Sequence, residues 1–442
     1  MSDGSPGTKQ VTTKRVAVFG LGYVGLPLIR ACINAGHAVT GFDINPNVVA
    51  SIRAGRSHVD DVDDVEIQQW LASGFHPTAN ENDLTDIDVF VICVPTPLTK
   101  AGGPDLTAVE SATRTIERHL NSMPHRKPLV ILESTTYPGT TEEIVKPILE
   151  KNGLTAGQDF ALAFSPERID PGNKTFTLEN TPKVVGGFTR GCGAAATEFY
   201  QDLVVQVVPV KGLKEAEMTK LLENTYRHVN IALVNELAKL SHLMGIDIRD
   251  VIQAAETKPY GFQAFRPGPG VGGHCIPIDP NYLSHRVRTE LGQSFRFVEL
   301  AQEINASMPN YVVQRVQEIL NEDSIALSGA AILVLGVTYK RDIADMRESP
   351  AIPVIKELIR LGANVTYHDP YVDDLTIGAT TIPRCTDLAA DAPKAACIIL
   401  IQDHGEYHDR SALLQARRIL DTRGTRTTSD AMEDTATQWT RL

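Results

Sequence analysis

The loop at residues 267–280, PGPGVGGHCIPIDP, contains the side chain best suited to nucleophilic catalysis, Cys275. Its four glycines and four prolines exclude a regular helix or strand and suit a backbone that lies close to a ligand. A thiolate is a good nucleophile and its thioester a good acyl carrier, so Cys275 indicates acyl chemistry. The alternative is a buried structural cysteine in a tight loop. Asp279 lies four residues later, and His274 is expected to point away from its neighbour and to be structural.

Lys220 and Asn224 lie four residues apart in a long helical pattern and therefore share one face of a helix. A fixed ammonium and an amide donor on one face can hold an alkoxide or an oxyanion. Taken alone, the pair is more simply explained as a solvated lysine beside a polar asparagine. The helix therefore predicts a site only in combination with other segments.

The sequence GLGYVG, residues 20–25, follows an apolar run at residues 16–19 and opens a helical pattern. Gly20 permits a tight turn, Gly22 lets the backbone approach a pyrophosphate, and Gly25 lets the helix pack closely on the strand. The next expected strand ends at Asp43, where a carboxylate would bind both ribose hydroxyls and repel a 2′-phosphate. The segment predicts an NAD site. A glycine-rich turn with a surface aspartate is the alternative.

Two more polar segments follow expected strands: CVPTP at residues 93–97 and EST at residues 133–135. In an open parallel sheet the carboxyl ends of the strands line the ligand crevice. Thr96 and Thr135 are therefore candidate cofactor contacts. The alternative is that both threonines only satisfy the backbone of turns.

These segments need a scaffold of alternating strands and helices. Buried strands are predicted at residues 16–19, 38–42, 89–94 and 129–132, shorter ones at 161–164 and 204–208, and a second block at 331–335, 364–367 and 396–401. Between the two blocks, leucines at helical spacing predict one long helix from Glu215 to Met244. The expected fold class is α/β, with two Rossmann-like doubly wound domains joined by a central helical domain with one long helix.

Composition excludes several classes of protein. A net charge of -12 argues against a nucleic-acid binder, and the polar N-terminus lacks the apolar core of a signal peptide. No apolar run approaches a membrane span. The six cysteines show no CxxC pairing, so neither disulfides nor a metal site is expected, and a cytoplasmic protein is predicted. Cys32, Cys93 and Cys397 are predicted to be core residues.

Together these segments resemble the UDP-glucose/GDP-mannose dehydrogenase family, whose members oxidise nucleotide-linked hexoses to uronic acids with NAD. The resemblance covers residues 16–401 and rests on GLGYVGLP, CVPTPL, ESTTYPGT, SPER, the Lys220–Asn224 helix, GPGVGGHCIPIDP and GVTYKRDIADMRESPA, in that order. Two rivals, a two-electron β-hydroxyacid dehydrogenase and a catalytically silent nucleotide-sugar sensor, are disfavoured. The first needs neither Cys275 nor a second α/β block, and the second predicts loss of Cys275, Lys220 or Asp279.

The resemblance implies a role for each matching residue. The catalytic set is Cys275 as nucleophile, Lys220 and Asn224 as oxyanion donors, Asp279 and Thr135 as holders of water, and Glu167 as an aid to hydrolysis. The implied NAD contacts are Gly20, Gly22, Tyr23, Val24, Gly25, Asp43, Thr96 and Thr135. The implied substrate contacts are Glu167, Arg168, Lys220, Asn224, Phe265, Gly272, Gly273, Lys340 and Arg347. Only Gly336 follows the first strand of the second block, which favours a nucleotide-sugar site there over a second NAD site.

The resemblance also sets the expected domains and partners. We expect a disordered N-terminus at 1–13, an NAD-binding domain at 14–212, a central helical dimerisation domain with the catalytic loop at 213–315, a UDP-binding domain at 316–421 and a polar, disordered tail at 422–442. The implied cofactor is NAD, the implied partner a nucleotide sugar, and the implied assembly a homodimer.

The sugar is predicted from departures within the family. Pro171 stands where the UDP-glucose type has a second acidic residue, and CIPIDP at residues 275–280 replaces its CLPKD pattern. Both departures resemble the N-acetylhexosamine branch, and UDP-N-acetylglucosamine is the favoured substrate. Arg266, near the expected sugar site, weakens the choice of epimer. UDP-N-acetylmannosamine and UDP- or TDP-glucose therefore stay open.

Overall fold

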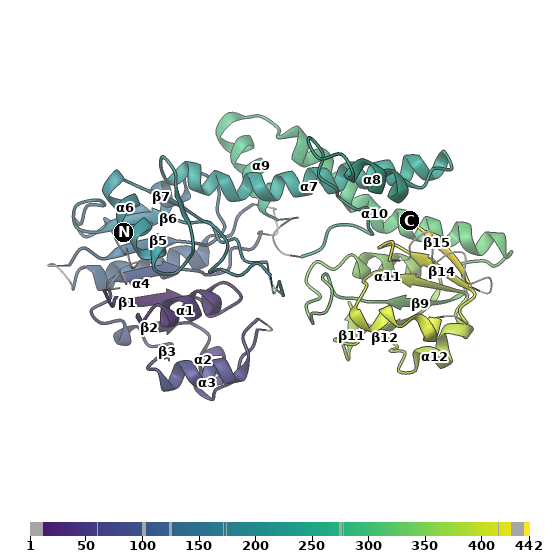
Figure 1. Ribbon diagram of the computed structural model, residues 1–442, viewed down its shortest axis with the longest axis horizontal. Coiled ribbons are helices and arrows are strands. Elements are labelled where there is room, and N and C mark those ends of the chain that lie inside the picture. The colour runs from purple at the N-terminus through teal and green to yellow at the C-terminus, as the bar shows by residue number, and fades with distance from the viewer. Residues whose placement is uncertain are drawn as a thin grey trace, which may run out of the picture. The chain divides into compact units, whose positions relative to one another are not determined.

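The computed structural model describes residues 12–59, 61–99, 103–122, 126–170, 172–173, 175–273, 276, 278–413, 415–425 and 437–442 (Figure 1). Internal contacts divide the chain into two compact units. Unit 1 comprises residues 1–223 and 289–291, and unit 2 comprises residues 224–288 and 292–442. The domain boundaries expected from the sequence stay predictions.

Unit 1 is built on an eight-stranded sheet with the order β3-β2-β1-β4-β5-β6-β7-β8. The strands are β1 (Arg15–Phe19), β2 (Ala38–Phe42), β3 (His76–Thr78), β4 (Val89–Ile92), β5 (Leu129–Leu132), β6 (Ala161–Phe164), β7 (Lys183–Gly187) and β8 (Val207–Pro209). Every neighbouring pair is parallel except β6 and β7. The first six strands thus have the 3-2-1-4-5-6 order of a doubly wound sheet, which confirms the expected Rossmann architecture.

Side chains on the two faces of this sheet form separate cores. Val16 and Val18 of β1 belong to one buried cluster, and Ala17 and Phe19 belong to the other. Successive side chains of a strand point to opposite faces, so a strand buried on both faces must be apolar throughout. The helices of unit 1 are α1 (Gly25–Asn34), α2 (Pro46–Arg53), α3 (Asp64–Ala72), α4 (Thr107–Leu120), α5 (Lys146–Leu149, preceded by a π-helical turn at Thr141–Val145) and α6 (Arg190–Gln201).

The expected long helix is α7, Leu213–Leu243, which begins in unit 1 and continues in unit 2. It contains neither glycine nor proline, as an uninterrupted helix of this length requires. The helices that follow are α8 (Ile248–Glu256), α9 (Asp279–Leu291) and α10 (Arg296–Glu322).

Unit 2 contains the second nucleotide-type sheet, with the order β10-β9-β13-β14-β15 and all pairs parallel. The strands are β9 (Ala331–Leu335), β10 (Asn364–His368), β13 (Cys397–Leu400), β14 (Arg418–Asp421) and β15 (Gln438–Arg441), with α11 (Ala351–Arg360), α12 (Leu388–Asp391) and a hairpin of β11 (Leu375–Ile377) and β12 (Thr380–Ile382). This is the 2-1-3-4-5 order of doubly wound sheets, which confirms the second Rossmann-like domain.

Two predictions from the sequence were wrong. The strand expected at 204–208 begins only at Val207, because the backbone N–H of Val204 donates to the Tyr200 carbonyl oxygen and closes α6. The disordered tail expected from residue 422 is ordered at 422–425 and at 437–442, where β15 pairs with β14. Of the residues 1–13 that are expected to be disordered, residues 1–11 lie outside the described part of the chain.

Candidate active site

The phosphate-type turn of unit 1 connects β1 to α1. Gly20 has a φ of 94°, and a Cβ there would lie 2.6 Å from the Cys93 carbonyl oxygen. A Cβ on Gly25 would lie 1.9 Å from the Gly20 carbonyl oxygen, whereas a Cβ on Gly22 would meet no atom within 4 Å. The first and third glycines are therefore required by the packing of the protein itself. The second leaves the open space that a close ligand needs.

The start of α1 is suited to an anion. Its N-cap residue, Val24, makes no side-chain cap, and its first turn contains no acidic side chain. The positive end of the helix dipole and the first backbone N–H groups are therefore not matched by a carboxylate of the helix itself. Together with Gly22, this arrangement fits the pyrophosphate of a dinucleotide, with Tyr23 and Val24 in the same turn.

Asp43 follows β2 and anchors the turn. Its carboxylate accepts hydrogen bonds from the backbone N–H of Leu21 at 3.0 Å and of Asn45 at 2.8 Å. The side chain is only half buried, so the carboxylate also has an accessible side. This position at the end of β2 is the one at which a carboxylate binds the ribose hydroxyls of NAD.

The ends of β4 and β5 are joined by a hydrogen bond from Ser134 Oγ to the Val94 carbonyl oxygen, 2.8 Å long. Thr96 is buried on the first of these segments, and Thr135 is half buried on the second. Both predicted cofactor contacts thus follow strands at the carboxyl edge of the sheet. In open parallel sheets this edge forms the ligand crevice.

Lys220 lies in a buried ion pair. Its Nζ is 2.9 Å from Oε2 of Glu167, and both side chains are less than a tenth exposed. A buried ammonium requires a partner of opposite charge, which Glu167 supplies from the segment after β6. The neighbouring Arg168 donates to Glu223 and, at 2.8 Å, to the Pro182 carbonyl oxygen. Two residues predicted for catalysis, Lys220 and Glu167, are therefore in direct contact.

Asn224, one turn after Lys220 on α7, donates from Nδ2 to Oδ2 of Asp279 at 2.6 Å. Asp279 is 3% exposed and stands in the first turn of α9, where the helix dipole favours a negative charge. This contact joins two further predicted catalytic residues within unit 2. Cys275 and His274, which precede Asp279 in the loop, lie outside the described residues, as does Pro171.

The described part of the catalytic loop packs against the second Rossmann-like domain within unit 2. A Cβ on Gly272 would lie 2.9 Å from Tyr339 Cβ, and one on Gly273 would lie 2.8 Å from the Tyr339 ring. Both glycines predicted as substrate contacts are thus needed for close approach to the segment after β9. Phe265, also predicted at the substrate, is half buried with its ring edge-on to that of Tyr226, 5.8 Å between centroids.

The turn after β9 carries the predicted nucleotide contacts Lys340 and Arg347. Lys340 is half buried, and Arg347 is exposed and donates to both carboxylate oxygens of Asp345. The turn begins at Gly336, which has a φ of 76° and would meet the Gln402 carbonyl oxygen at 2.5 Å if it carried a Cβ. This glycine is the one that the sequence singles out after the first strand of the second block.

Sequence analysis missed two buried polar residues that hold these segments. Glu217 of α7 accepts hydrogen bonds from Gly139 N, Thr141 N and Thr141 Oγ1 at 2.6 to 2.8 Å, so it fixes the segment that follows Thr135. His404 contacts the turn that contains Lys340. Neither residue lies in an unusual sequence pattern. Each is recognised only by its hydrogen-bond partners, which come from distant parts of the chain.

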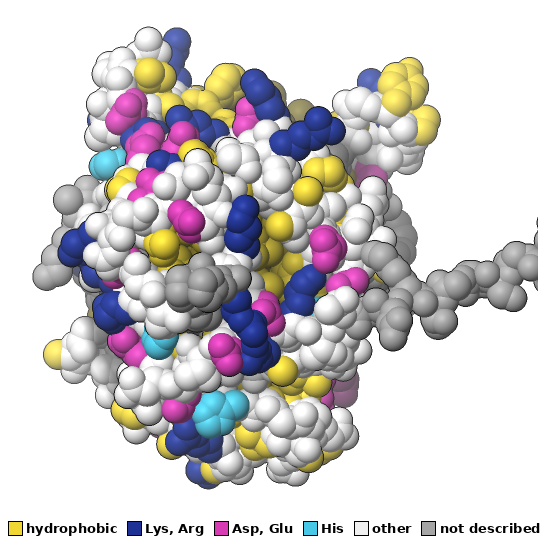
Figure 2. Space-filling view, turned by 90° about the vertical axis from the view of Figure 1, so that its left-hand side faces the viewer, with side chains coloured by type: hydrophobic (Ala, Val, Ile, Leu, Met, Phe, Trp, Pro, Cys, Tyr) yellow, Lys and Arg dark blue, Asp and Glu magenta, His cyan; other side chains and the backbone are white. Residues whose placement is uncertain are grey.

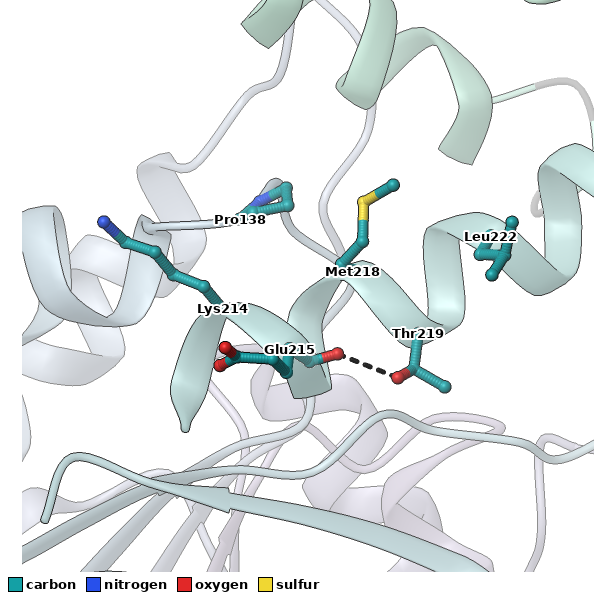
Figure 3. Close-up of a pocket in the computed structure, with 6 residues that line it drawn as sticks. All are labelled: Pro138, Lys214, Glu215, Met218, Thr219 and Leu222. Atoms are coloured by element: carbon teal, nitrogen blue, oxygen red, sulfur yellow. Dashed lines mark hydrogen bonds between the residues drawn. The ribbon is translucent and has the colours of Figure 1, made fainter. Parts of the chain in front are cut away.

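A surface pocket of about 420 Å³ lies beside the first turns of α7 (Figure 3). Its lining residues are Pro138, Lys214, Glu215, Met218, Thr219 and Leu222, and in Figure 3 Met218 and Leu222 project from the helix. Thr219 Oγ1 is bound to the Glu215 carbonyl oxygen at 2.8 Å, so it is not aimed at a ligand. None of the predicted catalytic residues lines this pocket.

Both kinds of charge are present on the surface. Figure 2 shows Lys and Arg side chains interspersed with Asp and Glu over one face of the molecule. In the described residues, no helix is both long enough and apolar enough to span a bilayer.

Three features define the class of protein: a dinucleotide turn on a 3-2-1-4-5-6 sheet, a buried lysine on α7, and a second domain of the nucleotide-binding type. The class is that of NAD-dependent dehydrogenases with a separate domain for the nucleotide of the substrate. Known proteins identify the family. Sequence models of the UDP-glucose/GDP-mannose dehydrogenase family match residues 14–204 as its NAD binding domain, 214–307 as its central domain and 333–428 as its UDP binding domain. The chain belongs to this family and is an NAD-dependent oxidoreductase of nucleotide sugars.

The similarity to individual proteins agrees with this family. The UDP-N-acetyl-D-glucosamine 6-dehydrogenase of Pseudomonas aeruginosa is 38% identical over 404 residues, which cover 90% of this chain and 92% of the relative. The UDP-N-acetyl-D-mannosamine dehydrogenase of Pyrococcus horikoshii is 37% identical over 382 residues, 84% of this chain and 89% of the relative. The solved structure of the UDP-D-ManNAc dehydrogenase from Pyrococcus horikoshii matches with a TM-score of 0.86 at 33% identity and covers 97% of this chain and 99% of that one.

Proposed function

We propose that the enzyme oxidises the C6 alcohol of UDP-N-acetylglucosamine to the carboxylate in two successive two-electron steps. The observation that carries the proposal is the pair of buried contacts on successive turns of α7, Lys220 with Glu167 and Asn224 with Asp279. A buried ammonium and an oriented amide are the donors that an alkoxide and a tetrahedral oxyanion require. The relatives with the glucosamine and mannosamine names support an N-acetylhexosamine substrate.

The choice between epimers rests on the coverage of the relatives and on Arg266. The glucosamine relative aligns with 90% of this chain and the mannosamine relative with 84%, at nearly equal identity. Arg266, in the segment expected near the sugar, is exposed and paired with Glu256 at 2.6 Å. We therefore place the gluco epimer first and the manno epimer second, with UDP- or TDP-glucose as the next alternatives.

The first oxidation needs a proton acceptor and a stabilised alkoxide. The C6 hydroxyl proton passes to a water molecule held by Asp279 and Thr135, and Lys220 and Asn224 stabilise the developing negative charge. NAD, when bound at the turn after β1, accepts one hydride in each of the two oxidations. Cys275 then attacks the aldehyde carbon, and the resulting thiohemiacetal oxyanion meets the same two donors.

The second oxidation converts the thiohemiacetal into a thioester of Cys275, and water must then release the acid. Asp279 activates that water or Glu167 assists it, and the thiolate of Cys275 leaves. In sum, one primary alcohol, one water and two NAD⁺ give one carboxylate, two NADH and three protons. Covalent attachment prevents escape of the aldehyde between the two steps.

A second copy of the chain is the proposed cover for one face of α7. Leu233, Leu237 and Leu240 of unit 2 are exposed there at helical spacing. Such an apolar stripe is typical of a helix that packs against another. Light scattering should give a dimer for the wild type and a monomer for Leu240→Glu, and a monomeric wild type would contradict the homodimer.

We also propose that the enzyme works in the cytoplasm. Five cysteines in the described residues, Cys32, Cys93, Cys192, Cys385 and Cys397, are free and buried. Unpaired thiols of this kind are typical of a reducing compartment. Burial raises the pKa of Cys32, Cys93, Cys385 and Cys397 above the usual thiol range, so these four are unreactive core residues.

Cys275→Ser tests the covalent mechanism. The variant should bind NAD and the UDP-sugar as the wild type does but should not sustain oxidation to the carboxylate, because serine does not form a thioester. Mass spectrometry of the wild type quenched during turnover should show an acyl adduct on the peptide that contains Cys275. Normal turnover of Cys275→Ser, or an adduct elsewhere, would contradict this function.

A further inference from the structure

His404 lies four residues after the end of β13, at the carboxyl edge of the second sheet, and its side chain is fully buried. The rings of Tyr371 and Tyr407 pack around it at centroid distances of 5.0 and 5.7 Å. A buried imidazole must satisfy both ring nitrogens, so its partners define which nitrogen carries the proton.

The partners of His404 fix one tautomer. The backbone N–H of Asp342 donates to Nδ1 at 3.0 Å, and a backbone amide can only donate. Nδ1 is therefore the acceptor, and Nε2 carries the proton and donates to Oδ2 of the buried Asp369 at 3.0 Å. Nε2 also lies 3.2 Å from Thr338 Oγ1, whose own hydrogen goes to the Lys340 carbonyl oxygen at 2.8 Å. One imidazole thus contacts both ends of the segment 338–342.

Asp342, at the far end of that segment, has an unfavourable backbone. Its φ is 59°, in the left-handed region that is unfavourable for a residue other than glycine unless its surroundings hold it. A reciprocal pair of hydrogen bonds provides the hold: Asp342 N donates to His404, and Gly405 N donates to Asp342 Oδ1 at 2.7 Å. Without the His404 acceptor, the backbone N–H of Asp342 loses its bond, and the side-chain bonds of Asp342 to Gly405 N and Arg341 are left.

We propose that His404 is a positioning residue for the uridine diphosphate site: by clamping Thr338 and Asp342, it presents Lys340 between them to the nucleotide. This inference rests on the proposed role of Lys340 as a nucleotide contact. Asp369 completes the clamp, since it accepts from His404 and from the backbone N–H of Val337 and Tyr371. The loop is therefore set before the nucleotide arrives, which lowers the ordering cost of binding.

Two substitutions separate the two functions of the imidazole. In His404→Asn the amide oxygen takes the place of Nδ1 and can still accept from Asp342, whereas in His404→Gln the amide nitrogen takes the place of Nε2 and keeps only the Asp369 bond. We expect UDP binding, measured by calorimetry, to weaken at least tenfold in His404→Gln and less than threefold in His404→Asn. His368→Gln is the control, because His368 contacts Tyr407 and Glu406 in the same cluster.

The kinetic readout separates positioning from loss of fold. In His404→Gln the KM for the UDP-sugar should rise more than kcat falls, and the affinity for NAD should not change. Equal UDP affinity in the Asn and Gln variants, whether intact or weakened, would overturn the proposal. A wild type that binds no UDP would instead overturn the role of Lys340 and of the domain, so the two failures are distinguishable.

A surface pair tests the same clamp where folding is less at risk. Asp342 is exposed, and Asp342→Asn retains both the acceptor for Gly405 N and tolerance of a positive φ, whereas Asp342→Ala retains neither. UDP affinity should fall at least fivefold in Asp342→Ala and stay within twofold of the wild type in Asp342→Asn. Unchanged affinity in Asp342→Ala would also overturn the proposal.

Discussion

In unit 1, four residues separate Gly20 from the first residue of α1, whereas in unit 2 fourteen residues separate Gly336 from the first residue of α11. Up to the glycine, the two turns are alike. Gly20 N donates to the Phe42 carbonyl oxygen and Gly336 N to the His368 carbonyl oxygen, both at 2.9 Å. The same strand-to-turn geometry thus occurs twice in one chain, with two different continuations.

The aspartates after the second strands extend the likeness. Asp43 accepts from the backbone N–H of Leu21 and Asn45, and Asp369 accepts from that of Val337 and Tyr371. Asp43 is half buried with an accessible side, but Asp369 is fully buried against His404. Burial would raise the pKa of Asp369, but the hydrogen bonds from His404 and the two amides outweigh it and hold that pKa below its usual value.

The different lengths of the segment after the glycine suit the two turns to two different nucleotides. In unit 1 the helix follows at once, and its N-terminus with the open space at Gly22 suits a pyrophosphate without any cation. In unit 2 the long loop separates the helix from the strand end and contains three cationic residues, Lys340, Arg341 and Arg347, of which Lys340 and Arg347 are the proposed nucleotide contacts. The carboxylate of Asp369 already accepts from His404 and two backbone amides, so it does not offer the role proposed for Asp43, the binding of ribose hydroxyls.

The largest expected effect concerns the helix that follows the turn at once. Gly25→Ala should destabilise unit 1 by about 3 kcal/mol or more, because its Cβ would lie 1.9 Å from the Gly20 carbonyl oxygen and would push α1 from β1. Chemical denaturation should show this loss, and NAD affinity should fall with it. A variant as stable as the wild type would contradict the packing account.

Gly22→Ala is the matched control for that substitution. Its Cβ would meet no protein atom within 4 Å, so stability should change by less than about 0.5 kcal/mol. NAD affinity should nevertheless fall at least tenfold, with UDP affinity unchanged, because the new methyl group occupies the space proposed for the pyrophosphate. Unchanged NAD affinity would place the cofactor elsewhere.

Each unit also has a buried polar side chain that holds a loop, and Glu217 is the counterpart of His404 in unit 1. Burial raises the pKa of Glu217 to about 7, despite three hydrogen-bond donors to its carboxylate. The unfolded chain ionises this group near its usual 4.5, so the stability it contributes is complete below about pH 4.5 and is lost as the pH rises through 7.

The direction of this pH dependence can be measured by comparison with Glu217→Gln, whose side chain at position 217 does not titrate. The unfolding free energy of the wild type minus that of the variant should fall by about 2 to 3 kcal/mol between pH 5 and pH 8. The reference to the variant removes titrations elsewhere in the chain. A difference that rises with pH would mean that the three donors hold the ionised carboxylate more strongly than burial opposes it.

The smallest expected effect concerns the cationic loop. Lys340→Met should weaken UDP binding about tenfold, since a charge-assisted contact to phosphate is worth about 1.5 to 3 kcal/mol, and should leave NAD binding intact. Lys356→Met, on the exposed face of α11, is the control and should leave both affinities unchanged. Equal UDP affinity in Lys340→Met would show that the nucleotide does not depend on this lysine.

Local pattern was enough to predict the scaffold. The apolar run before Gly20, the GLGYVG turn and the spacing of leucines on α7 are each set by residues a few positions apart, and β1, α1 and α7 formed where expected. β15 was missed because QWTR has no apolar run and acquires its partner, β14, only in the folded sheet. Val204, read as the start of a strand, is held by the end of α6 instead.

Motifs in the sequence named residues that the structure brings into contact, and their roles in the site stay predictions. Residues held by long-range contacts were missed. Lys220, Asn224 and Asp279 were named from their segments, and the contacts Lys220–Glu167 and Asn224–Asp279 followed. Glu217 could not be distinguished from the other acidic residues of its helix, because its partner Gly139 is 78 positions away. His404 and Asp342 are likewise 62 positions apart in the sequence, so no local sequence pattern indicates their contact.

The central claim is a four-electron oxidation of a UDP-N-acetylhexosamine, and the ratio of NADH formed to sugar consumed tests it most directly. With NAD in excess, limiting UDP-N-acetylglucosamine, UDP-N-acetylmannosamine, UDP-glucose and TDP-glucose are supplied in parallel, and NADH absorbance is followed to completion. The account predicts two NADH per sugar, fastest with UDP-N-acetylglucosamine. One NADH per sugar, or none with any of the four, would contradict it.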